Sequence, residues 1–347
     1  MKILIIQTAS IGDVILATAV LEELHDAYPS AEIDLLVKKG MESLFQAHPF
    51  IQKLIVWDKK NKYRDILRIL REVRKTRYDM VINLQRFALT GLITALSGAR
   101  ETVGFTKNPL AFLFTRRIKH IIKKGIHEVE RNRSLIIPVL PANHKNNLSG
   151  FIQGPKLYPS PSDEARVEAL KTRVEALEAK VSALKARPYV SISPASLWFT
   201  KQYPASKWVE LIQTLPEEID IYLLGSPADF PLCETIKNLS SRAKLSSLAG
   251  SLSFLESAAL MRDALMNYTN DSAPMHLASA VNAPVTAVYC STVPEFGFGP
   301  LSDKKWIIQS RKQLSCRPCG LHGKTECPLG HFECALTINV SQFAKHE

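Results

Sequence analysis

Short apolar runs alternate along the chain with longer segments of helix-like pattern. Four such runs, rich in β-branched residues, occupy residues 2–7, 32–37, 53–58 and 79–84. Apolar runs of this length between helical segments are typical of parallel strands joined by crossover helices. A second series follows at 189–196, 220–227, 244–250, 264–271 and 284–290. The pattern therefore predicts an α/β fold with two doubly wound halves.

The boundary between the halves falls in residues 140–164, which are rich in Pro, Asn, Gly and Ser. A chain of 347 residues also exceeds the usual size of one hydrophobic core. We therefore expect two Rossmann-like domains, at 1–160 and 189–347, joined by a helix or linker at 161–188.

A heptad pattern lies within this joining segment. Apolar residues repeat there at alternating steps of three and four, at Val167, Leu170, Val174, Leu177, Val181 and Leu184. Val at one seam position and Leu at the other favours paired parallel helices. Two outcomes stay open, a weak homodimer through residues 163–187 and packing of the stripe on its own chain.

The balance of charge favours an anionic partner. Lys and Arg number 44 against 33 Asp and Glu, so the formal net charge is +11. Nucleic acid, anionic lipid and phosphorylated substrates all fit, as does a basic surface without such a partner. The stretch 115–134 concentrates basic residues and is the part expected to meet a phosphorylated lipid or an anionic leaflet.

We expect a cytoplasmic protein whose contact with a membrane, if any, is peripheral. No signal-peptide cleavage site follows the first residues, and no apolar run reaches the 18 or so residues that span a bilayer. Two of the six cysteines lie in apolar segments and four crowd the tail, which is unlike a secreted disulfide framework.

The first candidate site follows the first predicted strand. The loop at Ser10, Gly12 and Asp13 lies at the carboxyl edge of the sheet, where ligands bind in open α/β folds. It has neither the dinucleotide fingerprint nor the P-loop pattern. Glycine would let a ligand approach the backbone closely. The alternative is that Ser10 or Asp13 caps the following helix.

The second candidate site is the segment 269–284, again a strand end followed by a helix start. Asp271 and Ser272 suit a helix cap, and the free N–H groups of the first turn attract anions such as a diphosphate. His276 lies one turn along and reaches the same ligand, unless it is a half-buried structural histidine.

The third candidate site combines two loops of the second half. Thr200 and Lys201 follow a predicted strand at the same edge as Asp271, where a lysine balances phosphate charge. A solvated surface lysine is the alternative. Asp229 follows Gly225 by four residues, a spacing that suits a contact with ribose hydroxyls.

The tail holds a cysteine cluster, at Cys316, Cys319, Cys327 and Cys334. Its C-x2-C start resembles half of a zinc site, although the second pair is spaced more widely than in a zinc knuckle. Structural zinc and packed or redox-active thiols both remain open.

Three stretches together resemble glycosyltransferase family 9, the heptosyltransferases of lipopolysaccharide inner-core assembly. They are TASIGDVILAT (8–18), FTKQYP (199–204) and NDSAPMHLASA (270–280). The cysteine-rich tail is most similar to the heptosyltransferase II branch. The resemblance covers nearly the whole chain and implies a GT-B fold, two Rossmann-like domains that face each other across a cleft.

The resemblance also implies roles for the candidate residues. Asp13 matches the general base of an inverting transfer from ADP-heptose to a lipid A–Kdo type acceptor, and Lys201 matches a phosphate contact. Asp229 matches a ribose contact, and the donor-binding motif falls on Asp271, Ser272 and His276. No cofactor is required, and metal is expected at none of these residues. The acceptor is expected on the N-terminal side and ADP-heptose on the C-terminal side.

Two positions depart from the family pattern and bear on donor identity. Ala273 and Cys290 stand where family members usually have Gly. Another GT-B glycosyltransferase or an epimerase that uses a different nucleotide sugar is therefore the main alternative. A nucleic-acid-binding protein is a weaker one, because the sequence has no recognition helix or aromatic ladder.

Overall fold

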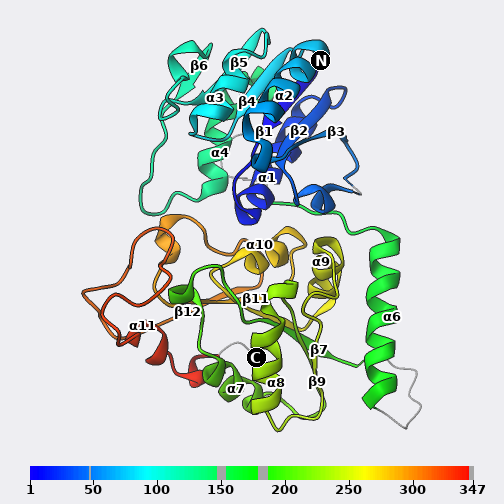
Figure 1. Cartoon of the computed structure of the whole chain (residues 1–347), viewed down its shortest axis with the longest axis vertical. Coiled ribbons are helices and arrows are strands. Elements are labelled where there is room, and N and C mark those ends of the chain that lie inside the picture. Colours follow the sequence, from blue (N-terminus) through cyan, green and yellow to red (C-terminus); the bar gives the residue numbers. More distant parts are fainter. Residues whose placement is uncertain (47, 147–153, 179–186, 344–347) are drawn as a thin grey trace. The chain divides into compact units, whose positions relative to one another are not determined.

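The chain forms two compact units, Met1–Tyr158 and Pro159–Glu347. The computed structural model describes residues 1–46, 48–146, 154–178 and 187–343. Each unit contains a six-stranded sheet with helices packed around it (Figure 1). The division falls close to residue 160, where the sequence placed the end of the first domain.

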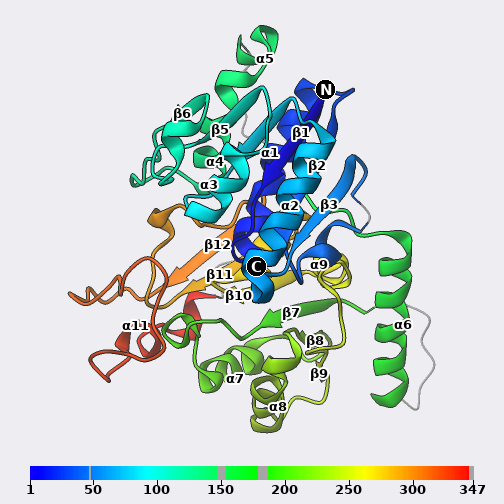
Figure 2. The same ribbon diagram turned by 45° about the horizontal axis from the view of Figure 1, so that its top comes forward.

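The sheet of the first unit has the strand order β3-β2-β1-β4-β5-β6, and neighbouring strands are parallel. Its strands are β1 (Lys2–Ile6), β2 (Glu32–Lys38), β3 (Ile51–Trp57), β4 (Met80–Asn83), β5 (Glu101–Phe105) and β6 (Arg116–Ile118). Strand β1 lies at the centre, and its four isoleucine and leucine residues are fully buried. Figure 2 shows β1 and β2 side by side.

The sheet of the second unit repeats this topology. Its order is β12-β11-β10-β7-β8-β9, also with parallel neighbours. The strands are β7 (Tyr189–Ser193), β8 (Asp220–Leu223), β9 (Leu245–Ser247), β10 (Met266–Asn270), β11 (Val285–Tyr289) and β12 (Lys305–Gln309). In each sheet, the first three strands are added on one side of the sheet and the next three on the other. The strand order therefore switches between β1 and β4 in the first unit and between β7 and β10 in the second. Ligands of doubly wound sheets bind at the carboxyl ends of the strands at such a switch point.

Helices connect the strands. The first unit has α1 (Ile11–Ala27), α2 (Lys62–Thr76), α3 (Ala88–Ala95), α4 (Glu128–Ile136) and α5 (Ala142–Asn146). The second has α6 (Pro161–Glu178), α7 (Ala205–Thr214), α8 (Phe230–Leu239), α9 (Phe254–Asp263), α10 (Ala273–Ala280) and α11 (Glu333–Leu336). Helices α1 and α10 follow the switch-point strands β1 and β10 after loops of four and two residues. No helix in the described part of the chain is long and apolar enough to cross a membrane.

All nine predicted strands are present, and within the described residues three further strands were missed. Strands β6 and β12 are sheet edges, and β6 has the sequence Arg-Arg-Ile with both arginines exposed. Edge strands tolerate charged residues because one side of the strand has no neighbour, so they lack the apolar signature of a buried strand. Strand β5 contains Gly104, which weakens the same signature.

Helix α6 contains the first part of the heptad stripe. Val167 and Leu170 are buried, and α6 packs against α9 of the same unit (Figure 1, Figure 2). This part of the stripe therefore packs on its own chain. The side chains of Val174 and Leu177 and residues 179–186 lie outside the description, and self-association through 163–187 stays a prediction.

Candidate active site

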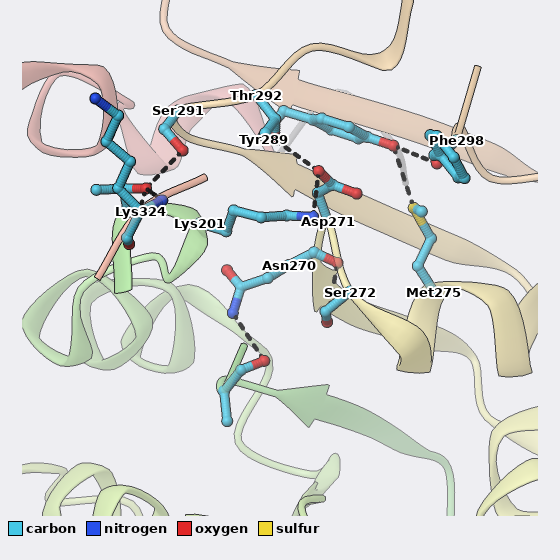
Figure 3. A network of polar contacts seen from close by, with 12 residues as sticks. Lys201, Asn270, Asp271, Ser272, Met275, Tyr289, Ser291, Thr292, Phe298 and Lys324 are labelled. Carbon is cyan, nitrogen blue, oxygen red and sulfur yellow. Dashed lines mark hydrogen bonds and ion pairs between the residues drawn. The ribbon is translucent and has the colours of Figure 1, made fainter. Parts of the chain in front are cut away.

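An ion pair crosses the switch point of the second sheet. Lys201 Nζ lies 2.7 Å from Asp271 Oδ2, and the two side chains are 15% and 8% exposed. Lys201 ends the short 3-10 turn Phe199–Lys201 after β7, and Asp271 directly follows β10. The side chains point toward one another (Figure 3). The structure thus brings together two of the residues that the sequence predicted for one sheet edge.

Thr292 holds the same carboxylate from a third loop. Its hydroxyl donates a 2.6 Å hydrogen bond to Asp271 Oδ2, and the Thr292 side chain is buried. Thr292 follows β11, the neighbour of β10. Sequence analysis missed this residue, although its place just after a predicted strand was a usable signal.

Asn270 joins the loops that follow β7 and β10. Its amide donates to the Pro194 carbonyl at 2.7 Å, and its carbonyl oxygen accepts from the Tyr203 backbone at 2.9 Å. Asn270 is fully buried, so these bonds satisfy polar groups that have no access to water. Asn270 was not among the predicted site residues, and its role is to fix the geometry of the loop that contains Lys201.

The N-terminus of α10 faces the edge next to Asp271. Ser272 is its N-cap residue, with extended backbone, and Ala273 and Pro274 open the helix. Backbone N–H groups of a first helical turn, together with the helix dipole, form a site for an anion. His276 lies in the next turn and is buried. A diphosphate at this helix end would lie beside Lys201.

Asp229 and Cys290 are placed differently. The Asp229 carboxylate accepts hydrogen bonds from the Ser226 backbone and hydroxyl at 2.8 and 2.7 Å, in the capping box of the short turn Pro227–Asp229 after β8. Its described contacts are thus with Ser226 rather than with Lys201 or Asp271. Cys290 is fully buried in the core of the second unit, where burial raises the pKa of its thiol well above the usual value. Its side chain belongs to the core rather than to the ligand edge.

In the first unit, Ser10 is the N-cap residue of helix α1, and Asp13 is its partner in the capping box. The Ser10 hydroxyl and backbone N–H both donate to Asp13 Oδ2, at 2.5 and 3.3 Å. Gly12 is buried at the second position of the helix. The capping role considered from the sequence is therefore present. Asp13 remains half-buried at the carboxyl edge of β1, so capping and proton transfer are compatible.

Charged residues from α4 lie near Asp13. Burial raises the pKa of the Glu128 carboxyl, the 2.6 Å ion pair with Arg131 opposes the rise, and the negative charge of Asp13 adds to it. Glu128 begins α4 and was missed by sequence analysis.

Positive charges gather near the same edge. Burial lowers the pKa of His120 to about 4, and three nearby positive charges add to the shift. They belong to Arg86, Lys107 and Arg131. These charges make the local potential of this region more positive, although Arg131 is itself paired with Glu128.

The cysteine-rich tail surrounds a hollow of about 430 Å³, lined by Cys316, Pro318, Cys319, Gly320, Lys324, Cys327, Pro328 and Leu329. Cys316 Sγ lies 3.9 Å from His331 Nε2, while Cys334 is buried. Across the residues that the structure describes, no three His, Cys, Asp or Glu side chains are grouped so as to hold a metal ion. Structural zinc and packed or redox-active thiols both stay open for this cluster.

Comparison with known proteins places these features in context. The model of glycosyltransferase family 9 (heptosyltransferase) matches residues 66–329. The chain is 25% identical over 337 residues to lipopolysaccharide heptosyltransferase 1 of Pseudomonas aeruginosa, covering 92% of this chain and 86% of that protein.

Two solved structures share the fold. One is the E. coli ADP-heptose lipopolysaccharide heptosyltransferase II, with a TM-score of 0.77 and 22% identity over 100% of this chain and 97% of the other. The second, an E. coli heptosyltransferase with ADP-2-deoxy-2-fluoro heptose, has a TM-score of 0.67 and 20% identity over 99% of each chain. The predicted fold class, GT-B with two Rossmann-like domains, is thereby confirmed.

Proposed function

The chain belongs to glycosyltransferase family 9, the heptosyltransferase family, and on that basis we propose that it transfers heptose from ADP-heptose to the lipopolysaccharide inner core. The acceptor is a phosphorylated glycolipid of the lipid A–Kdo type, and the transfer inverts the anomeric centre. The proposal rests on the Lys201–Asp271 pair, which lies beside the N-terminus of α10 at the switch point of a doubly wound parallel sheet.

The donor diphosphate binds at this switch point. Lys201 supplies a positive charge, and the N–H groups of α10 supply hydrogen bonds. Together they stabilise the negative charge that develops on ADP as it leaves, so no metal ion is needed to bind the leaving group. Ser272 and His276 contact the donor from α10, and Asp229 contacts its ribose. Thr200, whose hydroxyl bonds to Ser291 and Lys324, holds the turn that contains Lys201.

Asp13 removes the proton of the acceptor hydroxyl. The hydroxyl oxygen attacks the anomeric carbon from the face opposite ADP, its bond to carbon forms while the bond from carbon to the diphosphate oxygen breaks, and the proton passes to the Asp13 carboxylate. The half-buried position of Asp13 just after β1, at the sheet edge where ligands of such folds bind, supports this role.

The reaction takes place in the cytoplasm, with the first unit docked on the anionic inner face of the membrane. No Asp or Glu occurs between Glu101 and Glu128, whereas this stretch holds Lys107, Arg116, Arg117, Lys119, Lys123 and Lys124. Apolar side chains are exposed in the same stretch, at Phe112, Leu113, Ile121 and Ile122. Exposed apolar groups among cations suit an anionic lipid surface.

Calorimetry with nucleotides tests the donor assignment. ADP and ADP-heptose are expected to bind, and UDP-sugars to bind at least tenfold more weakly. Tighter binding of a UDP-sugar would favour the alternative of a GT-B enzyme with another donor. Tight, steeply salt-dependent binding of DNA or RNA, without affinity for ADP, would favour the nucleic-acid alternative.

A further inference from the structure

We propose that the cysteine-rich segment 316–327 is a positioning element of the donor site, in which Gly323 and Lys324 hold Lys201 in place for the diphosphate. The identity of the ligand rests on the proposed function. The geometry of the segment does not.

The backbone of Lys324 is paired with Thr200, the neighbour of Lys201. Thr200 N–H donates to the Lys324 carbonyl at 3.1 Å, and Lys324 N–H donates to the Thr200 hydroxyl at 2.8 Å. The Ser291 hydroxyl donates to the same Thr200 oxygen at 3.0 Å. Thr200 is only 1% exposed, so these bonds are shielded from water and costly to lose. The segment thus fixes the turn that contains Lys201.

Gly323 lies directly against the Lys201 side chain. A Cβ atom on Gly323 would lie 2.9 Å from Lys201 Cγ and 3.2 Å from the Thr200 hydroxyl oxygen. Contacts this short force a neighbour to move, and Cγ is near the base of the lysine chain rather than at its flexible end. The close approach of the Gly323 backbone therefore confines the aliphatic part of the Lys201 side chain, whose ammonium group contacts Asp271.

The same segment is fixed to the carboxyl end of β11. The Arg317 guanidinium donates to the Cys290 carbonyl at 2.7 Å and to the Thr292 carbonyl at 2.8 Å. Cys319 N–H donates to the Ser291 carbonyl at 2.8 Å. Since Thr292 is the residue that hydrogen-bonds Asp271, one segment supports both sides of the ion pair.

Such support has a chemical purpose. A free lysine side chain loses much rotational freedom when it binds a ligand, and this loss weakens binding. A lysine whose stem is already confined loses less. The segment therefore increases affinity for the diphosphate without contacting it, and Gly323 is a positioning residue rather than a catalytic one.

Two glycines of the tail provide a matched test. Gly323 and Gly330 have φ angles of +79° and +72°, so alanine strains the backbone at both positions. A Cβ on Gly330 meets no atom within 4 Å. We expect Gly323→Ala and Gly330→Ala both to lower Tm through this backbone strain, and Gly323→Ala to lower it further because it also separates the largely buried Lys201–Asp271 pair. Only Gly323→Ala should raise the Kd for ADP and the KM for the donor, about tenfold, and it should also lower kcat, because a displaced Lys201 no longer stabilises the charge on the departing ADP.

A double-mutant cycle tests the route of the effect. In a Lys201→Ala background, Gly323→Ala is expected to change the Kd for ADP less than twofold, because the residue it displaces is already gone. The inference would be overturned if Gly323→Ala bound ADP as tightly as the parent. It would also be overturned if Gly323→Ala still raised the Kd for ADP tenfold in the Lys201→Ala background.

Crystal structures of the two glycine variants separate this inference from the proposed function. If the parent protein binds no ADP, the proposed function fails, and the position of Lys201 still decides the inference. In Gly323→Ala the distance from Lys201 Nζ to Asp271 Oδ2 should exceed 4 Å, whereas in Gly330→Ala it should remain near 2.7 Å. An unchanged ion pair in Gly323→Ala would overturn the inference.

Discussion

Lys201 and Asp271 form a largely buried ion pair that joins the loops after β7 and β10. A buried charge without a partner is costly, so each residue depends on the other in the absence of a ligand. A diphosphate would offer Lys201 a second anionic partner at the same sheet edge. The pair is therefore both a structural contact and the counter-charge of the proposed donor site.

Lys201→Ala should weaken ADP binding by about 1.5–3 kcal/mol, the loss of a hydrogen bond between charged groups. Calorimetry would detect this as a change in Kd of roughly ten- to a hundredfold. Lys207→Ala is the control, because Lys207 also forms a 2.7 Å ion pair, but with the exposed Glu210 on helix α7. Equal affinities for ADP in both variants would remove Lys201 from the donor site.

Asp13→Asn should lower kcat by about two to four orders of magnitude, because an amide cannot accept the acceptor proton. Asn still accepts hydrogen bonds at a cap, so Tm should change little. Asp163→Asn is a matched control, since Asp163 forms the same type of cap with Ser160 at the start of α6. Asp13→Ala should in addition lose about 1 kcal/mol of folding free energy. Full activity of Asp13→Asn would leave capping as the role of this residue.

The pairing of Lys201 with Asp271 was predictable because both residues follow strand ends. Apolar runs located β7 and β10, and the loops after parallel strands meet at one edge, which brought Lys201 and Asp271 together. The support for Lys201 was not predictable. Thr200 and Lys324 are 124 residues apart, and their bonds run through the backbone, which has no sequence signature. Gly323 was not singled out from the sequence, because its close approach to Lys201 exists only in the folded structure.

His120 should make the protein less stable in acid. Its pKa is about 4 in the folded chain against 6.5 in the unfolded chain, so between these values the unfolded chain binds more protons. The free energy of unfolding therefore falls as the pH falls from 6.5 to 4. When the pH is lowered from 7.5 to 5, the Tm of the His120→Gln variant should therefore fall less than the Tm of the parent. Parallel losses in the two proteins would contradict the burial of a neutral imidazole.

The first unit should bind anionic vesicles. Lys123→Glu combined with Lys124→Glu should reduce binding to vesicles that contain phosphatidylglycerol at least tenfold, since each basic residue near an anionic surface contributes about 1 kcal/mol. Lys304→Glu with Lys305→Glu is the control, because these lysines are also adjacent and exposed but lie in the second unit. Equal binding of both variants in co-sedimentation would show that residues 102–127 are not the membrane surface. If the first unit recognises only the phosphorylated acceptor, the protein should bind lipid A–Kdo but not phosphatidylglycerol.

Product analysis tests heptose transfer most directly. The protein is incubated with ADP-heptose and a lipid A–Kdo acceptor in the presence of EDTA, and the glycolipid is analysed by mass spectrometry. The expected result is a mass gain of one heptose per acceptor with equimolar release of ADP, strongly reduced in Asp13→Asn and Lys201→Ala but retained in Asp163→Asn. The proposed function would be contradicted if the acceptor stayed unmodified with ADP-heptose but was converted to a product with another nucleotide sugar.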